Sequence, residues 1–195
     1  CEPAAVDYSG PLADWPAYGG DLGGLKYSPL TQITRDNVGD LEIAWTYHSG
    51  DKADGSGEWS KTSFSANPLV AGGLLYLCTG FARVIALDPE TGAERWSFDP
   101  KLVAKKGQGP YTLNCRGVAH WAGDADGQGG EPAKARPACA SRIFTGTRDS
   151  ELIALDAASG LPCADFGVQG RVSLREGIGA APAWTMTVWP PSMVI

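Results

Sequence analysis

Apolar residues in this chain come in short runs that are separated by turns rich in glycine and proline. The runs LLYLCT at 74–79, VIAL at 84–87 and RIFTGT at 142–147 have the length of buried strands and are too short for most helices. Polar residues lie between the runs, and the abundant glycine (26) and proline (14) favour tight turns. The pattern therefore predicts an all-β fold that is built from antiparallel meanders.

One unit of this pattern occurs twice. The segment VIALDPETG at 84–92 matches LIALDAASG at 152–160, an offset of 68 residues (152 minus 84). Similarity at a fixed period is the sequence signature of propellers and other repeat folds. The closing part of the first copy, GAERWSF at 92–98, also matches GDLEIAWTY at 39–47. We therefore expect two similar propeller blades, and we expect residues 39–47 to form the last strand of a preceding blade.

The offset between the two copies is longer than the roughly 40 to 50 residues of one propeller blade. The excess lies at 100–141, where the segments KKGQGP and GDADGQGGEPAKARP have the composition of loops. We interpret 100–141 as an inserted loop region within one propeller domain that covers 1–195. Because long loops on one face of a propeller commonly carry the binding site, function is expected there.

Length and charge narrow the class of protein. A chain of 195 residues is the size of one domain. The formal net charge is -6, and the lysines and arginines are scattered, so no basic stripe is present that would bind nucleic acid. No apolar run approaches the roughly 20 residues that a membrane-spanning helix needs.

The cysteines indicate disulfide bonds. There are five cysteines, none of them in a CxxC pair, and two histidines, so the spacing of zinc ligands is absent. Disulfides persist in oxidising compartments, which points to a periplasmic or secreted protein. Two pairings are hypotheses, because four cysteines permit three connectivities: Cys139 with Cys163, and Cys78 with Cys115. Cys1 is either a lipid-modified anchor, an unpaired thiol or the partner of another cysteine.

The repeat unit itself resembles a known family. ALDPETGAERW at 86–96 fits the pattern A-x-D-x-x-T-G-x-x-x-W that recurs in quinoprotein dehydrogenases, and some non-enzymatic propellers use related repeats. Asp88 and Thr91 can cap the turn, Gly92 permits a positive φ, and the ring of Trp96 can fill the gap between adjacent blades. The second copy keeps the aspartate and the glycine as Asp156 and Gly160.

Further segments resemble this family more closely: 14–33 is similar to PQQ-dependent alcohol and glucose dehydrogenases, and 114–121 together with 139–167 resembles the branch that contains glucose and quinate dehydrogenases. DWPAYGGDLGGLKYSPLTQI at 14–33 is similar to the stretch before the first blade, and NCRGVAHW at 114–121 is similar to a motif beside the cofactor. The resemblance implies an eight-bladed β-propeller, of which this chain covers the first two to three blades. It also implies pyrroloquinoline quinone (PQQ) near the propeller axis, with a bound Ca²⁺ that polarises the quinone.

The resemblance assigns cofactor contacts to individual residues. Arg116 matches an arginine beside the quinone, although a surface or interblade salt bridge is an alternative role for it. Thr112 stands where many relatives have a histidine, and Ser65 where many have a glutamate, so only neutral hydroxyls are present at these positions. Trp189 stands at a usual serine position, where an indole would reshape the pocket.

The expected function is oxidation of a sugar, polyol or other alcohol in the periplasm, with electrons passed through PQQ to a respiratory acceptor. The catalytic residue and the Ca²⁺ ligands are expected downstream of Ile195, because the chain stops inside an apolar run. Two alternatives stay open. In the first, the chain belongs to a non-catalytic propeller, a lipoprotein or scaffold that binds partner proteins. In the second, it is an inert truncated product whose blade faces are exposed.

Overall fold

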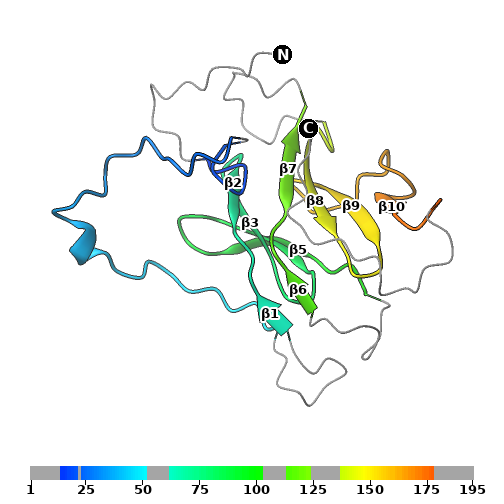
Figure 1. The fold of residues 1–195 in the computed structure, drawn as a ribbon, viewed down its shortest axis with the longest axis horizontal. Helices are drawn as coiled ribbons and strands as arrows, with labels where there is room; N and C mark the ends of the chain where they lie inside the picture. Colours follow the sequence, from blue (N-terminus) through cyan, green and yellow to red (C-terminus); the bar gives the residue numbers. More distant parts are fainter. Residues whose placement is uncertain (1–13, 22, 52–61, 103–112, 124–136, 178–195) are drawn as a thin grey trace.

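The computed structural model describes residues 14–21, 23–51, 62–102, 113–123 and 137–177, and all statements below concern these residues. The described chain is all-β, as predicted, apart from one 3-10 turn, η1 at Val38–Asp40. Its strands form two four-stranded antiparallel sheets and one two-stranded parallel ladder (Figure 1). None of the described helical segments is long and apolar enough to span a membrane.

Each four-stranded sheet is a meander of consecutive strands, which is the construction of a propeller blade. The first blade has the order β2-β3-β4-β5 and consists of β2 (Leu69–Ala71), β3 (Leu74–Cys78), β4 (Val84–Leu87) and β5 (Glu94–Phe98). The second blade has the order β10-β9-β8-β7 and consists of β7 (Ala119–Ala122), β8 (Ser141–Gly146), β9 (Glu151–Asp156) and β10 (Arg171–Ser173).

A parallel ladder joins the segments that lead into the two blades. β1 (Thr62–Phe64) precedes the first blade and pairs with β6 (Leu113–Cys115), which precedes the second, and the two lie side by side in Figure 1. β6 and β7 both fall within 100–141, so this region contains the first strand of the second blade. The two segments of loop composition lie almost entirely outside the described residues.

The central strands are buried on both faces. All four residues of β4 are buried, and so are the last four residues of β9. Val84 and Ala86 of β4 belong to one core cluster with Ile153 and Leu155 of β9, which means that the blades pack face to face. Because neither face of these strands meets water, the sequence there is a continuous apolar run without polar alternation.

The conserved pattern of the repeat forms the turn between the third and fourth strands of each blade. Oδ1 of Asp88 accepts hydrogen bonds from the backbone N–H groups of Glu90 and Thr91, both at 3.0 Å. Oδ1 of Asp156 accepts from the N–H of Ser159 at 2.8 Å in the second blade. These side-chain bonds satisfy turn donors that the strand ladders leave unpaired.

The tryptophan that ends the first copy of the repeat packs against the turn of the second blade. Trp96 lies over Gly160, where an added Cβ atom would be 2.5 Å from the ring, and its indole N–H donates to the carbonyl oxygen of Ala157 at 3.0 Å. The hydroxyl of Tyr76 donates to the same oxygen at 3.1 Å. Burial raises the pKa of Tyr76, and the carboxylates of Asp156 and Asp14 raise it further, so the phenol stays a neutral donor.

Trp45 repeats this arrangement at the first blade. Its ring lies against Gly92, where an added Cβ atom would be 2.6 Å away, and its indole N–H donates to the carbonyl oxygen of Pro89 at 3.1 Å. The expectation of a strand at 39–47 is nevertheless wrong, since η1 ends within this segment at Asp40 and the rest of it forms no strand. A strand needs a neighbouring ladder, and none of the described residues pairs with 39–47.

Both expected disulfide pairs are bonded. Cys78 and Cys115 are joined across 37 residues, and Cys139 and Cys163 across 24 residues. The first bond connects the first blade to β6, whereas the second closes a loop around β8 and β9. Cys1 lies outside the described residues.

The Asp156 carboxylate gives the fold a predicted sensitivity to acid. Burial alone would raise its pKa, but hydrogen bonds from the Ser159 hydroxyl and from the N–H groups of Cys139 and Ser159 outweigh burial and lower the pKa. A carboxyl whose pKa is lower in the folded state stabilises the fold above its unfolded pKa, about 3.9, and loses that contribution as the pH falls through the folded pKa.

We therefore expect Asp156→Asn to lower the free energy of unfolding by about 1–3 kcal/mol at pH 7, because Oδ2 no longer accepts from Cys139. Urea unfolding at pH 7 and at about pH 3 should show a smaller difference between variant and wild type at the lower pH. Asp36→Asn, at an exposed aspartate, is the matched control. An Asp156→Asn deficit that is the same at both pH values would contradict the assignment.

Candidate functional site

The innermost strands of the two blades meet at one place. β1 leads into β2 and β6 leads into β7, and β2 contacts β7. Between each leading strand and its blade lies a short connecting segment, 65–68 in the first case and 116–118 in the second. We call these two segments together the inner rim. In a propeller the innermost strands of the blades lie around the central channel, so the inner rim is the part of this chain where a ligand near the axis is expected.

Arg116 occupies the inner rim of the second blade. It directly follows Cys115, the last residue of β6, and its carbonyl oxygen accepts a hydrogen bond from the N–H of Asn67 at 3.0 Å. Gly117 and Val118 after it are buried, whereas the Arg116 side chain is exposed. The backbone at Arg116 is therefore held by both blades while its guanidinium lies at the surface.

Ser65 occupies the corresponding place in the first blade. Phe64 and Cys115 are the last pair of the parallel ladder. Ser65 and Arg116 are therefore the first residues after the ladder in their two segments. The Ser65 side chain is also exposed. The structure thus brings two of the expected cofactor residues to one rim, and the other two, Thr112 and Trp189, lie outside the described residues.

Asn114 is a polar residue of this region that the sequence reasoning missed. Leu113 and Cys115 on either side of it are buried, so Asn114 and Arg116 alternate with them. The Oδ1 atom of Asn114 is buried and has no hydrogen-bond partner among the described residues. A buried amide oxygen without a partner is costly. The alternation of apolar and polar residues in L-N-C-R at 113–116 was the signal in the sequence that could have placed Asn114 on the same side of the strand as Arg116.

This set of groups suits an anionic, oxygen-rich ligand. A guanidinium offers a planar fork of donors that matches a carboxylate, a serine hydroxyl donates or accepts, and an amide oxygen accepts from an N–H group. PQQ, which carries carboxylates, quinone oxygens and a pyrrole N–H, has complementary groups. The residues of the rim therefore fit the cofactor that the sequence resemblance implies.

The described residues offer no comparable set for a metal ion. Their single cluster of potential ligands consists of Cys139, Cys163 and Asp165. Cys139 and Cys163 are bonded to each other, so neither supplies a thiolate.

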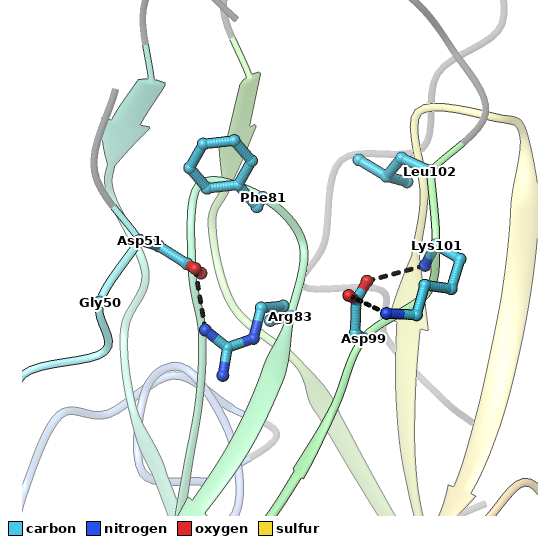
Figure 2. A pocket seen from close by; sticks show the side chains of 7 residues that line it. All are labelled: Gly50, Asp51, Phe81, Arg83, Asp99, Lys101 and Leu102. Carbon is cyan, nitrogen blue, oxygen red and sulfur yellow. Dashed lines mark hydrogen bonds and ion pairs between the residues drawn. The ribbon is translucent and has the colours of Figure 1, made fainter. Parts of the chain in front are cut away.

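A separate cavity of about 400 Å³ lies beside the first blade. Figure 2 shows two ion pairs in its wall, Arg83 with Asp51 at 2.8 Å and Lys101 with Asp99 at 2.7 Å. Because its two cations and two anions pair with one another, the cavity has no surplus positive charge for a polyanion. The inner rim is the better candidate for an anionic cofactor.

Two other arginines make long-range links to backbone carbonyl oxygens: Arg171 joins the two blades, and Arg83 joins the first blade to the segment before it. A bridge of this kind is the alternative role that was considered for Arg116. Nη1 of Arg83 donates to the carbonyl oxygen of Ser49 at 3.0 Å, and Nη2 of Arg171 donates to that of Pro100 at 3.2 Å. Ser49 and Pro100 each lie four residues after a docked tryptophan. The two bridges thus occur at equivalent places, which are distinct from the inner rim.

Known proteins share this sequence and fold. Residues 15–195 match the PQQ family described as "Glucose/ethanol/alcohol dehydrogenase, beta-propeller domain". Quinoprotein glucose dehydrogenase A of Acinetobacter calcoaceticus is 39% identical over 170 residues, which are 84% of this chain and 21% of that protein. The quinate/shikimate dehydrogenase (quinone) of Acinetobacter baylyi is 34% identical over 196 residues, covering 95% of this chain and 23% of that protein.

A solved structure is similar over most of the described fold. The quinohemoprotein alcohol dehydrogenase from Comamonas testosteroni matches with a TM-score of 0.65 and 29% identity, over 90% of this chain and 21% of that one. The chain thus spans about a fifth of the length of the relatives that it matches.

Proposed function

Because this chain belongs to the glucose/ethanol/alcohol dehydrogenase β-propeller family, we propose that it forms the opening blades of a PQQ-dependent dehydrogenase and supplies part of the quinone site. The observation that carries the proposal is the position of Arg116, in a motif shared with the family, at the rim where the inner strands of both blades meet.

Two residues of the inner rim, Arg116 and Ser65, and the neighbouring Asn114 on β6 have separate roles in this proposal. The guanidinium of Arg116 binds a carboxylate or quinone oxygen of PQQ and stabilises negative charge there. The hydroxyl of Ser65 and the amide of Asn114 orient the cofactor by hydrogen bonds. Thr112 and Trp189 are proposed to complete the same pocket. When bound, PQQ supplies the two-electron acceptor for oxidation of a CH–OH group to a carbonyl.

The substrate class follows from the relatives. We propose a sugar, polyol or other alcohol, because the matched proteins are named for glucose, quinate or shikimate, and alcohol. The electrons then pass to a respiratory acceptor, and Ca²⁺ bound by residues outside the described chain polarises the quinone. Two disulfides support an oxidising compartment, the periplasm. Lipid attachment at Cys1 stays a prediction that an intact-mass measurement would test.

A dye-linked dehydrogenase assay tests the proposed function. Because the catalytic residue is expected downstream of Ile195, the assay uses the complete propeller that contains this chain. That protein is incubated with PQQ and Ca²⁺, and reduction of an artificial electron acceptor is followed with glucose, quinate, glycerol and ethanol. We expect reduction with at least one of these donors, and only when PQQ is present. PQQ binding without turnover of any CH–OH donor would favour the alternative of a non-catalytic propeller.

A further inference from the structure

The Cys78–Cys115 disulfide lies where the two blades and the inner rim meet. Cys78 is the last residue of β3 in the first blade, and Cys115 is the last residue of β6, the strand that leads into the second blade. The two residues are 0% and 1% exposed, so the bond is part of the core. The bond therefore connects the end of β3 in the first blade to Cys115, the residue directly before Arg116.

The contacts around this bond constrain the backbone on both sides of Arg116. Before Arg116, Cys115 is tied to β3. At Arg116 itself the carbonyl oxygen accepts from the N–H of Asn67, and after it the carbonyl oxygen of Gly117 lies 3.3 Å from both sulfur atoms of the bond. Cys115 and Arg116 are thus both held against the first blade, and Gly117 is in contact with the disulfide.

Without the disulfide, the main support for this place would be a short ladder. β1 and β6 form only three residue pairs, in parallel register. An isolated two-stranded pair of this kind has marginal stability in water. A covalent bond at the end of the ladder supplies the constraint that so few backbone hydrogen bonds do not provide.

We propose that the Cys78–Cys115 disulfide is a positioning element for Arg116, which holds the guanidinium at the inner rim in the place where an anionic cofactor binds. The inference rests on the proposed function, because it assumes that Arg116 contacts PQQ. The bond acts by preorganisation: a side chain whose backbone is already ordered loses less conformational freedom when the ligand binds.

The second disulfide provides a matched control. Cys139 and Cys163 close a loop of similar length, 24 residues against 37, and their bond lies within the second blade. In a chain-entropy model the stabilisation grows only slowly with loop length, so the two bonds should stabilise the fold by similar amounts. A purely structural role therefore predicts similar consequences when either bond is removed.

The experiment compares Cys78→Ala/Cys115→Ala with Cys139→Ala/Cys163→Ala. Urea unfolding gives the stability of each, and PQQ titration in the presence of Ca²⁺ gives its Kd. We expect both variants to lose stability, but only the first to bind PQQ more weakly, by about tenfold. We also expect Arg116→Ala to weaken binding less in the first variant than in wild type, because an unpositioned arginine contributes less.

A second measurement covers the case in which Cys78→Ala/Cys115→Ala does not fold. The folded Cys139→Ala/Cys163→Ala protein is treated with a phosphine reductant until Cys78 and Cys115 are reduced, at a temperature where its circular dichroism is unchanged. Weaker PQQ binding after reduction is expected.

Unchanged affinity after loss of the Cys78–Cys115 bond, in a protein where Arg116→Ala does weaken binding, would overturn this inference and leave the proposed function intact. If wild-type protein binds no PQQ, the proposed function itself fails. The two failures are therefore distinguishable.

Discussion

Replacing Arg116 with alanine is expected to weaken PQQ binding by about 10- to 100-fold, because hydrogen bonds to a charged partner contribute about 1.5–3 kcal/mol each. The stability of the fold should change little, since the Arg116 side chain is exposed while its backbone bond to Asn67 is retained. PQQ titration followed by absorbance or fluorescence gives the affinity, and urea unfolding gives the stability.

Two variants make this result specific. Arg35→Ala removes an exposed arginine of the segment before the first blade and should leave the affinity for PQQ unchanged. Arg116→Lys keeps the charge but loses the planar fork of donors, so it should bind PQQ with an affinity between those of wild type and Arg116→Ala. Equal weakening by Arg35→Ala and Arg116→Ala would mean that only the overall charge matters, and Arg116 would lose its assigned role.

Replacing Gly160 with alanine is expected to lower the free energy of unfolding by about 3–5 kcal/mol. Gly160 has a φ of 72°, and an added Cβ atom would lie 2.5 Å from the ring of Trp96. The ring must therefore move away from the turn, which also breaks its hydrogen bond to Ala157. Because this contact joins the two blades, the loss should appear as a large shift in the urea midpoint.

Gly73→Ala separates the packing effect from the backbone effect. Gly73 has a similar φ of 78°, but an added Cβ atom there has no neighbour within 4 Å. This variant should cost only about 1–2 kcal/mol, the strain of a left-handed conformation in a residue with a Cβ atom. Equal destabilisation by the two variants would show that the Trp96 contact contributes nothing.

The fold was predictable where the local pattern and the packing agree. Asp156 and Gly160 recur at the same offset as the strands, and each has the turn role that its chemistry suggests. Trp96 follows at the spacing needed to reach the next turn. In these cases one residue type suits one geometry, so the repeated pattern was sufficient for the prediction.

Other features of the fold could not be predicted, because they depend on contacts between segments that are far apart in the sequence. Residues 39–47 resemble the closing strand at 92–98 and dock Trp45 in the same way, yet they form no strand, because strand formation needs a partner ladder. The parallel pairing of β1 with β6 joins segments far apart in the chain, so its register could not be read from either one.

The candidate site was predicted only in part. The family motif identified Arg116 and Ser65, but their matching positions at the end of one ladder became visible only in the structure. Asn114 was overlooked because its amide becomes notable only once Oδ1 is seen to be buried without a partner among the described residues. The burial of an atom and its hydrogen-bond partners are properties of the folded chain, so they could not be predicted from this sequence alone.

The most direct test of the account is a titration of the purified wild-type protein with PQQ in the presence of Ca²⁺. We predict saturable binding with one PQQ per chain, which is weakened when Arg116 is replaced. Absence of saturable binding to a protein that unfolds cooperatively would contradict the proposal that these blades supply part of a quinone site.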